Sequence, residues 1–341
     1  MIRQKSKLAM AISGGGAKGA FAVGVIKKLF ESYRSSGWFD IIGGTSAGAI
    51  IAPFAAMLGT EDRAVREEAL QRLVHFYSNV KTRDILRPRS ILKLLFRRDS
   101  FFETTPLRRL LTDHFPPEWF TWLKGSRAPH CYVVYTDYQS GEKVVVSPKD
   151  SGVDRGGFID AVMASASVPI LMKATRIGGN PCYDGGVRDL LPFATAIDLG
   201  AETIIPVFLD PRAFPESAGR LRRMDRIFLR TLNIFTDETL RNDDKMARLV
   251  NSGIRLRNEL SDLFAHDPWS SRKLEELFRR PEFASLLSPR RRLLRLVLDL
   301  RPDEPLTENA FKFDPERMQR WMKLGEAKAG EVISQDPFAD A

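Results

Sequence analysis

The chain has 341 residues, of which 43% are hydrophobic, and its 52 Lys and Arg residues outnumber its 43 Asp and Glu residues, which gives a formal net charge of +9. This composition is typical of a globular protein and excludes a disordered, collagen-like or repetitive chain. No apolar run approaches the roughly 18 residues that a transmembrane helix needs, and the positive charge favours attraction to anionic surfaces.

The first predicted strand, residues 8–12, leads into a glycine-rich loop at residues 14–19 (GGGAKG), and a helical pattern follows up to Leu29. Basic residues precede the strand, but its apolar run is shorter than the roughly 7 to 15 residues of a signal-peptide core, so we expect a cytoplasmic protein. Consecutive glycines allow backbone N–H groups to converge on one point, and the dipole of the following helix adds positive potential. The loop is therefore predicted to bind an oxyanion or a phosphate.

Two nucleotide-binding motifs come close to this loop. A Walker A loop needs a lysine after its last glycine, whereas Lys18 precedes Gly19 here. The dinucleotide pattern G-x-G-x-x-G is matched, and an acidic residue, Asp40, follows about 20 residues later. Asp40 begins the next predicted strand instead of ending it, however, so a nucleotide-binding module stays an alternative that the spacing disfavours.

A candidate nucleophile follows the second predicted strand, residues 39–42. The strand runs into Gly44-Thr45-Ser46-Ala47-Gly48, and a helical pattern covers residues 49–58. A serine between two glycines at a strand-to-helix switch can occupy a strained turn that presents its hydroxyl, while the amides at the start of the helix face any developing anion. We therefore expect Ser46 to be a nucleophile.

A candidate acid lies in the second half of the chain. Asp184-Gly185-Gly186 comes after a Gly-Gly-Asn-Pro turn and a short strand-like run. An aspartate followed by two glycines sits on a bend where its carboxylate can point into a cleft without neighbouring side chains in the way. The three motifs together would supply a nucleophile, an oxyanion loop and an acid.

The remaining elements follow from hydrophobic periodicity. Continuous apolar strands that are each followed by a helix predict a three-layer α/β/α sandwich with a mostly parallel central sheet, plus additional helices. We expect one domain over residues 1–341, in which residues 296–341 supply a closing strand and helix. The predicted elements are a hairpin of strands at 131–136 and 143–146, a helix at 194–199, a strand at 201–209, either a strand or a short helix at 292–300, and a helix at 315–334.

In this order, the three motifs resemble the patatin-like phospholipase family, whose pattern is a G-G-G-x-[KR]-G loop, a G-x-S-x-G elbow and a D-G-[GA] aspartate. The segment at residues 164–169 (ASASVP) also resembles the family's A-S-x-S-x-P sequence, and residues 292–300 then resemble its late strand. The resemblance spans about residues 7–210. Two departures are Ser13, where plant patatins carry Asp, and Lys18, where Arg is common.

This resemblance implies a lipid acyl hydrolase of the phospholipase A or lysophospholipase type, with a patatin-like fold. The enzyme would cleave carboxylic esters of membrane lipids through an acyl-Ser46 intermediate and a Ser46–Asp184 dyad, without a metal or a cofactor. Similar architectures also serve acyltransferases and thioesterases, which stay open as alternatives. The resemblance assigns the oxyanion hole to Gly14, Gly15 and Gly16, and the support of the elbow and loops to Lys18, Gly19, Gly44, Gly48, Gly185 and Gly186.

The histidines agree with a dyad. Only one of the four, His266, follows Asp184 as the order of an α/β-hydrolase triad requires, and it lies at the end of a charged helical stretch that does not present it. The carboxylate must then act as the base itself, and partial desolvation would help by raising its pKa above the usual value of about 3.9.

Two basic stretches lie outside the core pattern. Residues 85–115 and 220–295 interleave apolar residues with Lys and Arg, which suits either a helix in an anionic membrane interface or an amphipathic helix that covers the sheet. Neither stretch carries a nucleic-acid-binding motif, so we expect no nucleic acid partner. The two cysteines, Cys131 and Cys182, are expected to be free, buried thiols. The oligomeric state is left open.

Overall fold

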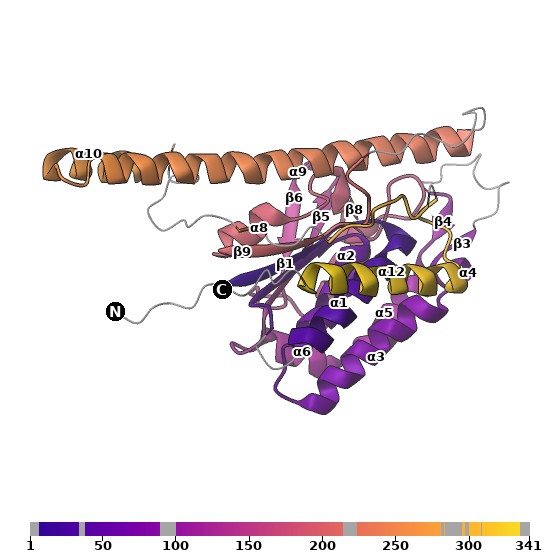
Figure 1. The fold of residues 1–341 in the computed structure, drawn as a ribbon. Coiled ribbons are helices and arrows are strands. Elements are labelled where there is room, and N and C mark those ends of the chain that lie inside the picture. Colours follow the sequence, from indigo (N-terminus) through magenta and orange to yellow (C-terminus); the bar gives the residue numbers. More distant parts are fainter. Residues whose placement is uncertain are drawn as a thin grey trace.

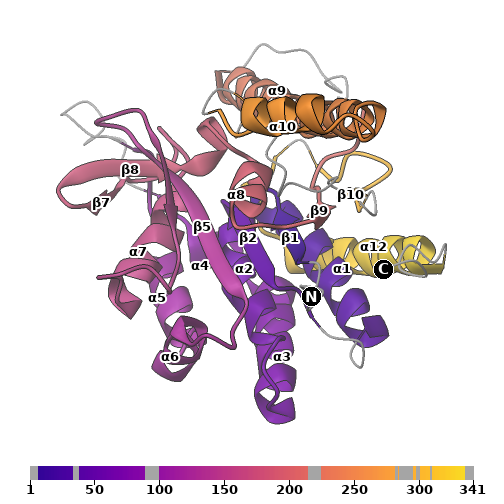
Figure 2. The same cartoon turned by 90° about the vertical axis from the view of Figure 1, so that its left-hand side faces the viewer.

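A computed structural model describes residues 7–33, 38–88, 100–213, 224–280, 283, 295–296, 300–307 and 309–334. In this part of the chain, helices cover both faces of a central sheet, which gives the three layers that the sequence predicts (Figures 1 and 2). The strands are β1 (Leu8–Ile12), β2 (Ile41–Thr45), β5 (His130–Asp137), β6 (Lys143–Val146), β7 (Thr175–Ile177), β8 (Asn180–Asp184), β9 (Thr203–Val207) and β10 (Arg295–Leu296), with a separate short pair, β3 (Arg87–Pro88) and β4 (Phe102–Glu103).

The sheet has a parallel half and an antiparallel half. Its order is β10-β9-β1-β2-β5-β8-β7, and β6 pairs with β5 beside this path. The strands from β10 to β5 are parallel, with Met10 of β1 opposite both Ile42 of β2 and Ile205 of β9, whereas β5 pairs antiparallel with β6 and β8. Because the parallel strands end at the same edge, the loops after β1, β2 and β9 meet there.

Most helices pack on one face of the sheet. Alternate residues of β1 face opposite sides, so that Met10 and Ile12 enter the larger core while Ala9 and Ala11 enter the smaller one. Figure 2 shows the larger layer on one side of the sheet and α8 and α9 on the other. The helices are α1 (Gly19–Tyr33), α2 (Ala47–Met57), α3 (Arg63–Asn79), α4 (Thr82–Ile85), α5 (Thr105–His114), α6 (Pro117–Lys124), α7 (Arg155–Ser165), α8 (Phe193–Asp198), α9 (Met224–Leu263), α10 (Pro268–Phe278) and α12 (Pro315–Ser334).

Helices α1 and α12 join the two ends of the chain by a close backbone contact. A Cβ atom on Gly24 would lie 1.9 Å from the carbonyl oxygen of Met322, and one on Gly325 would lie 2.1 Å from that of Phe21. Such distances leave no room for any side chain, so both glycines are needed for this approach. The C-terminal helix is thereby a part of the same core as the first strand and the glycine loop.

Helix α9 is the longest element, with 40 residues, and it crosses over the smaller core (Figure 1). Its side chains Leu240, Val250 and Ile254 are buried in that core, so this part of α9 packs against the sheet. None of the helices among the described residues is long and apolar enough to span a membrane.

Most of the predicted helices and strands are present in the structure, and some of them begin or end at other residues than predicted. Strand β1 and helix α12 have the predicted bounds, whereas β2 continues through Thr45 and α2 begins at Ala47, directly after the candidate nucleophile. Within 292–300, residues 295–296 are a strand and Leu300 bridges to Val207, so the strand alternative holds for the described part. Residues 89–99, the most basic part of the 85–115 stretch, lie outside the described residues. Both cysteines are free and buried, as expected.

Candidate active site

Ser46 occupies a strained turn between β2 and α2. Its backbone angles, φ 56° and ψ −117°, lie in a region that residues with a side chain rarely adopt. The turn requires glycine at two positions because the backbone packs too closely there for a side chain. A Cβ on Gly44 would lie 2.2 Å from the Gly48 carbonyl, and one on Gly48 would lie 2.2 Å from the Ile12 oxygen. The tight turn predicted at this serine is therefore present, with the N-terminus of α2 beginning at the next residue.

Residues of the ASASVP segment (164–169) form hydrogen bonds with the backbone of both Ser46 and Asp184. The backbone N–H of Ser46 donates to Ser165 Oγ (2.9 Å), and the Ser165 hydroxyl donates to the carbonyl of Val134 in β5 (2.5 Å). Two residues later, the carbonyl of Ser167 accepts from the N–H of Asp184 (2.9 Å). The role of Ser165 was not predicted, because its place in a segment upstream of the aspartate was the only signal in the sequence.

Asp184 ends β8 with its carboxylate against the Ser46 side chain. The N–H of Gly186 donates to its Oδ1 (2.8 Å). Burial raises the pKa of Asp184 to about 6, because desolvation disfavours the charged form more than the nearby Ser46 hydroxyl and the Gly186 N–H favour it. A carboxylate with such a pKa can accept a proton near neutral pH.

The glycine loop passes directly beside Ser46. A Cβ on Gly14 would lie 2.9 Å from the Cβ of Ser46, and the N–H of Gly14 already donates to the carbonyl of Leu190 (3.2 Å). Gly16 has a φ of +56°, and its chain is held by the N–H of Ala17, which donates to the carbonyl of Ala310 (2.8 Å). Among the described residues, no acceptor pairs with the N–H groups of Gly15 and Gly16. Gly14 was predicted to be an oxyanion donor, but its N–H is already paired with Leu190. The N–H groups of Gly15 and Gly16 are the ones that remain available.

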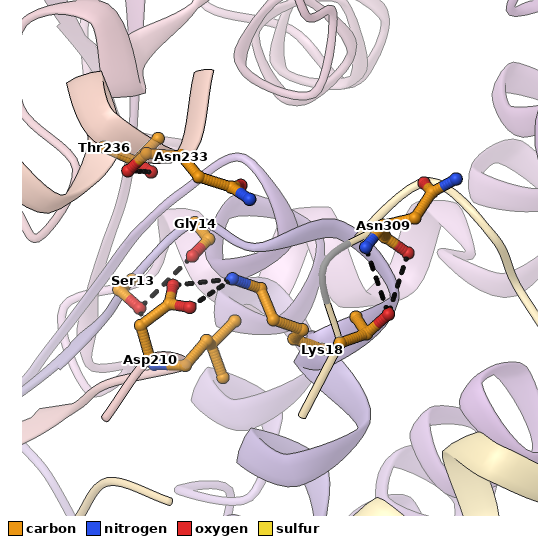
Figure 3. Close-up of polar contacts among 9 residues, drawn as sticks. Ser13, Gly14, Lys18, Asp210, Asn233, Thr236 and Asn309 are labelled. Carbon is orange, nitrogen blue, oxygen red and sulfur yellow. Dashed lines mark hydrogen bonds and ion pairs between the residues drawn. The ribbon is translucent and has the colours of Figure 1, made fainter. Parts of the chain in front are cut away.

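Two contacts tie this loop to the chain that follows β9. The ammonium group of the buried Lys18 lies 2.6 Å from each carboxylate oxygen of Asp210 (Figure 3). The hydroxyl of Ser13 accepts from the N–H of Leu209 (3.1 Å) and donates to the carbonyl of Gly14 (3.3 Å). Lys18 is part of the loop, so its ion pair links the loop to the chain after β9. Asp210 was missed, since only its position after a predicted strand could have pointed to it.

The remaining support residues are placed by close contacts. A Cβ on Gly19 would lie 2.7 Å from the hydroxyl of Tyr77, and one on Gly185 would lie 2.3 Å from the Val134 oxygen. A Cβ on Gly186 would lie 3.1 Å from Asp184 Oδ1. Gly19 thus leaves room for the Tyr77 ring and Gly185 for the β5 backbone, while Gly186 leaves room for the carboxylate of Asp184.

Ser46, Asp184, Lys18 and the glycines at positions 14–16 line a cavity of about 400 Å³. Helix α9 forms one wall of it, and Figure 3 shows Asn233 and Thr236 of this helix across from the Lys18–Asp210 pair. The rest of the wall is largely apolar, and a second, apolar pocket of about 30 Å³ shares Gly16, Ser46, Val168 and Phe311 with it. The cavity is lined by Gly14, Gly15, Gly16, Lys18, Ser46, Tyr138, Val168, Pro169, Ile170, Asp184, Gly186, Val187, Leu190, Asp210, Leu232, Asn233, Phe235, Thr236, Thr239, Ala310 and Phe311.

Comparison with known proteins assigns the chain to a family. Residues 10–197, more than half of the chain, match the family described as patatin-like phospholipase. The chain belongs to the patatin-like phospholipase family. Members of this family are typically serine hydrolases that act on lipids, and the match covers the glycine loop, the serine turn and Asp184.

Individual relatives are more distant. An uncharacterized NTE family protein of Mycobacterium bovis is 27% identical over 207 residues, which is 60% of this chain and 49% of that protein, and uncharacterized NTE family proteins of two Mycobacterium tuberculosis strains match to the same extent. The chain thus spans about half the length of the curated relatives it matches. Among solved structures, VipD from Legionella pneumophila superposes with a TM-score of 0.42 and 14% identity, over 97% of this chain and 67% of that one.

The histidines of this patatin-like chain lie away from the cavity. None of the described residues that line it is a histidine. His266 is exposed in the turn after α9, and the rings of His75 and His114 stack on each other between α3 and α5. Among the described residues, no group of three His, Cys, Asp or Glu side chains could hold a metal ion. Among the described residues that line the cavity, Asp184 is the carboxyl group whose pKa Ser46 affects.

The raised pKa of Asp184 predicts a cost in stability at neutral pH. The carboxyl group of Asp184 binds a proton more tightly in the folded protein than in the unfolded chain. Protonation of Asp184 therefore stabilises the fold fully below the ordinary pKa of 3.8, and this stabilisation is lost as the pH rises through about 6. Asp184→Asn removes the buried charge and is expected to raise the free energy of unfolding by up to roughly 3 kcal/mol near pH 8, with no gain near pH 4. Urea unfolding at the two pH values measures this difference, and an equal gain at both would show that burial of the charge is not the cause.

The Lys18–Asp210 pair predicts a positioning effect on the glycine loop. Asp210→Asn removes the charge that holds Lys18 and is expected to lower kcat for a soluble ester by roughly ten- to a hundredfold with little change in KM, because a displaced loop misaligns the amides. Steady-state kinetics with a p-nitrophenyl ester measure both constants.

A surface ion pair provides the control for this variant. Glu326→Gln breaks the pair between Lys27 and Glu326 (3.0 Å), which joins α1 to α12 away from the cavity. This variant should keep kcat within about twofold of the wild type, since partly exposed pairs contribute little. A rise in KM with unchanged kcat in Asp210→Asn would instead assign Asp210 to substrate binding.

Proposed function

We propose that this protein is a lipid acyl hydrolase of the phospholipase A or lysophospholipase type that works through a Ser46–Asp184 dyad. The observation that carries the proposal is that Ser46, on a strained turn, and the buried carboxylate of Asp184 line the same largely apolar cavity, close enough for Ser46 to lower the pKa of Asp184. The available amides of Gly15 and Gly16 beside this serine support it, since acyl transfer requires donors for the developing oxyanion. Family membership supports the same reaction class.

In the first half of the reaction, Ser46 Oγ attacks the carbonyl carbon of the ester while its proton passes to the Asp184 carboxylate. The carbonyl oxygen gains the negative charge of the tetrahedral intermediate, and the amides of Gly15 and Gly16 stabilise it together with the N-terminus of α2. When the intermediate collapses, the bond to the alcohol breaks and the leaving oxygen takes the proton from Asp184. The product is an acyl ester on Ser46.

In the second half, a water molecule attacks the acyl carbon and Asp184 accepts one of its protons. The tetrahedral intermediate collapses a second time, Ser46 Oγ leaves with the proton from Asp184, and the carboxylic acid is released. The carboxylate is therefore used twice, each time as a base and then as an acid. A pKa of about 6 suits this alternation better than that of a solvated aspartate.

The cavity supports a lipid as the substrate. Its apolar side chains suit an acyl chain, and the polar side chains of Lys18, Asp210 and Asn233 give one part of its wall groups that can interact with a headgroup. The positive charge of the chain favours peripheral contact with anionic membranes, where such substrates lie.

The nucleotide-binding alternative finds less support. Asp40 lies at the amino end of β2, whereas the loop of Gly14 lies at the carboxyl end of β1, so that the two are at opposite edges of the sheet. The carboxylate of Asp40 also accepts from the N–H of Leu8 (2.9 Å), which ties it to the sheet.

A panel of phospholipids and lysophospholipids tests the proposal. The wild type is expected to release free fatty acid from at least one class, Ser46→Ala should release none, and product analysis identifies the ester bond that is cleaved. Transfer of the acyl group to added alcohol or thiol in excess of hydrolysis would favour the acyltransferase alternative, and cleavage of acyl thioesters in preference to esters would favour the thioesterase. Absence of Ser46-dependent acyl release from every substrate would contradict all three.

A further inference from the structure

Exposed apolar side chains surround the mouth of the cavity. Four of the residues that line it are also large and solvent-exposed: Tyr138 (42%), Ile170 (54%), Val187 (53%) and Phe235 (66%). They come from four separate parts of the fold, namely the end of β5, the loop before β7, the turn after β8, and α9. Such convergence is unlike the scattered single apolar residues of an ordinary surface. We call these four residues the apolar rim.

Helix α9 extends the rim along its outer side. Ile234 is half exposed next to Phe235, and Ile227, two turns earlier, is 45% exposed. A spacing of seven residues places Ile227 and Ile234 on one face of the helix. The same helix therefore buries Leu240, Val250 and Ile254 against the sheet and turns other apolar side chains outward at the cavity.

One rim residue is held outward under strain. Ile170 has a φ of +70°, which is costly for a β-branched residue. The hydrogen bonds around it over-determine this conformation: its carbonyl accepts from the N–H of Phe101 (3.1 Å), and the N–H of Met172 donates to Val168 (2.9 Å). Strain that presents an apolar side chain to solvent at a cavity mouth points to a function for that side chain.

Basic residues accompany the rim. Arg188 directly follows Val187, Lys173 lies three residues after Ile170, and Arg226 precedes Ile227 on α9, and all three are exposed. Apolar side chains flanked by cations match the chemistry of an anionic bilayer surface, where acyl chains lie below negatively charged headgroups.

We propose that the apolar rim and its flanking cations are the surface by which this protein docks onto an anionic lipid bilayer, with the mouth of the cavity against the membrane. The inference rests on the proposed function, since a docked mouth lets a lipid enter from the bilayer without crossing water. The rim enters the level of the headgroups, and the acyl chain of a single lipid passes between α9 and the Pro169–Ile170 loop towards Ser46.

Binding to vesicles tests this surface without relying on catalysis. Every protein carries Ser46→Ala, so that the vesicles stay intact, and co-sedimentation with phosphatidylglycerol-containing vesicles measures the partition coefficient. The double variant Ile234→Ser/Phe235→Ser is expected to lower this coefficient by about tenfold or more, because two half-exposed apolar side chains no longer enter the membrane. Lys173→Gln should lower it about fivefold at low salt and leave binding to neutral vesicles unchanged.

The same helix provides a matched control. Leu249 and Leu256 are 55% and 53% exposed and lie beyond the part of α9 that lines the cavity. Leu249→Ser/Leu256→Ser should therefore bind vesicles as its Ser46→Ala parent does. Equal losses in the two double variants would mean that α9 binds along its whole length and would overturn the assignment to the rim. Val187→Ser, from a different element, repeats the test if the α9 rim variant does not fold.

Two further outcomes separate the alternatives. If the rim variants bind vesicles normally but change the mass of the protein in light scattering from a dimer to a monomer, the rim is an interface between copies of this chain and the docking proposal is wrong. If the rim variants lose vesicle binding while the wild-type enzyme shows no Ser46-dependent ester hydrolysis, docking holds and the proposed function fails instead.

Discussion

Replacing Ser46 by alanine is expected to abolish ester hydrolysis, with a loss in kcat of at least about 10⁴-fold. The reason is chemical: without the Oγ atom no acyl-enzyme forms, and the remaining amides and cavity can only assist direct attack by water. The turn itself should tolerate the change, because alanine keeps the Cβ atom and the N–H of residue 46 still donates to Ser165 Oγ. The measurement is the rate of hydrolysis of a soluble ester, together with covalent labelling by a fluorophosphonate.

Labelling shows whether the loss is specific. The wild type should incorporate one fluorophosphonate at Ser46, and Ser46→Ala should incorporate none. Ser140→Ala is the control, since Ser140 is exposed on the turn between β5 and β6 and should have no effect on rate or labelling. Retention of esterase activity in Ser46→Ala, with the label on another serine, would refute the proposed nucleophile.

Replacing Asp184 by asparagine is expected to lower kcat by roughly 10³-fold and to remove the pH dependence that the carboxylate imposes. Only the ionised carboxylate can take the proton of Ser46, and its pKa is about 6, so activity in the wild type should fall as the pH drops through about 6. Asparagine can still accept from the N–H of Gly186, so that the bend after β8 should persist. Profiles of kcat/KM against pH measure both effects.

A neighbouring aspartate provides the control for this variant. Asp189 lies five residues after Asp184 in the same loop. It is also buried, and its carboxylate forms an ion pair with Lys143 (2.8 Å). Asp189→Asn should keep the rise of activity near pH 6 even where it lowers stability. If His266→Ala abolishes activity and Asp184→Asn does not, the dyad is wrong and a triad must replace it.

Local motifs predicted the serine turn well, because its geometry depends on adjacent residues. Gly44 and Gly48 are needed at the positions where the chain reverses, and both can be recognised from a strand-like run before them and a helix-like run after them. The same holds for Asp184, whose bend follows from the two glycines after it. In these places sequence and structure agree because the glycines that allow the bend are adjacent in the sequence, even though distant residues such as Ser165 also hold the turn.

Contacts between distant segments could not be predicted in this way. Asp210 meets Lys18 only because β9 pairs with β1, and Leu190 engages the Gly14 amide only because the loop after β8 turns back over the glycine loop. The role of residues 220–295 was left open for the same reason. An amphipathic helix does not reveal which surface its apolar face will cover, whereas the structure places α9 over both the smaller core and the cavity.

The contact between α1 and α12 has a consequence for the order of events during biosynthesis. The glycine loop is synthesised long before α12, yet the N–H of Ala17 donates to the carbonyl of Ala310, and α1 packs closely against α12. Domains fold during synthesis only as their parts become available. The loop beside Ser46 therefore acquires its final shape only after residues 310–329 have emerged, so the active-site geometry depends on a segment made almost 300 residues later.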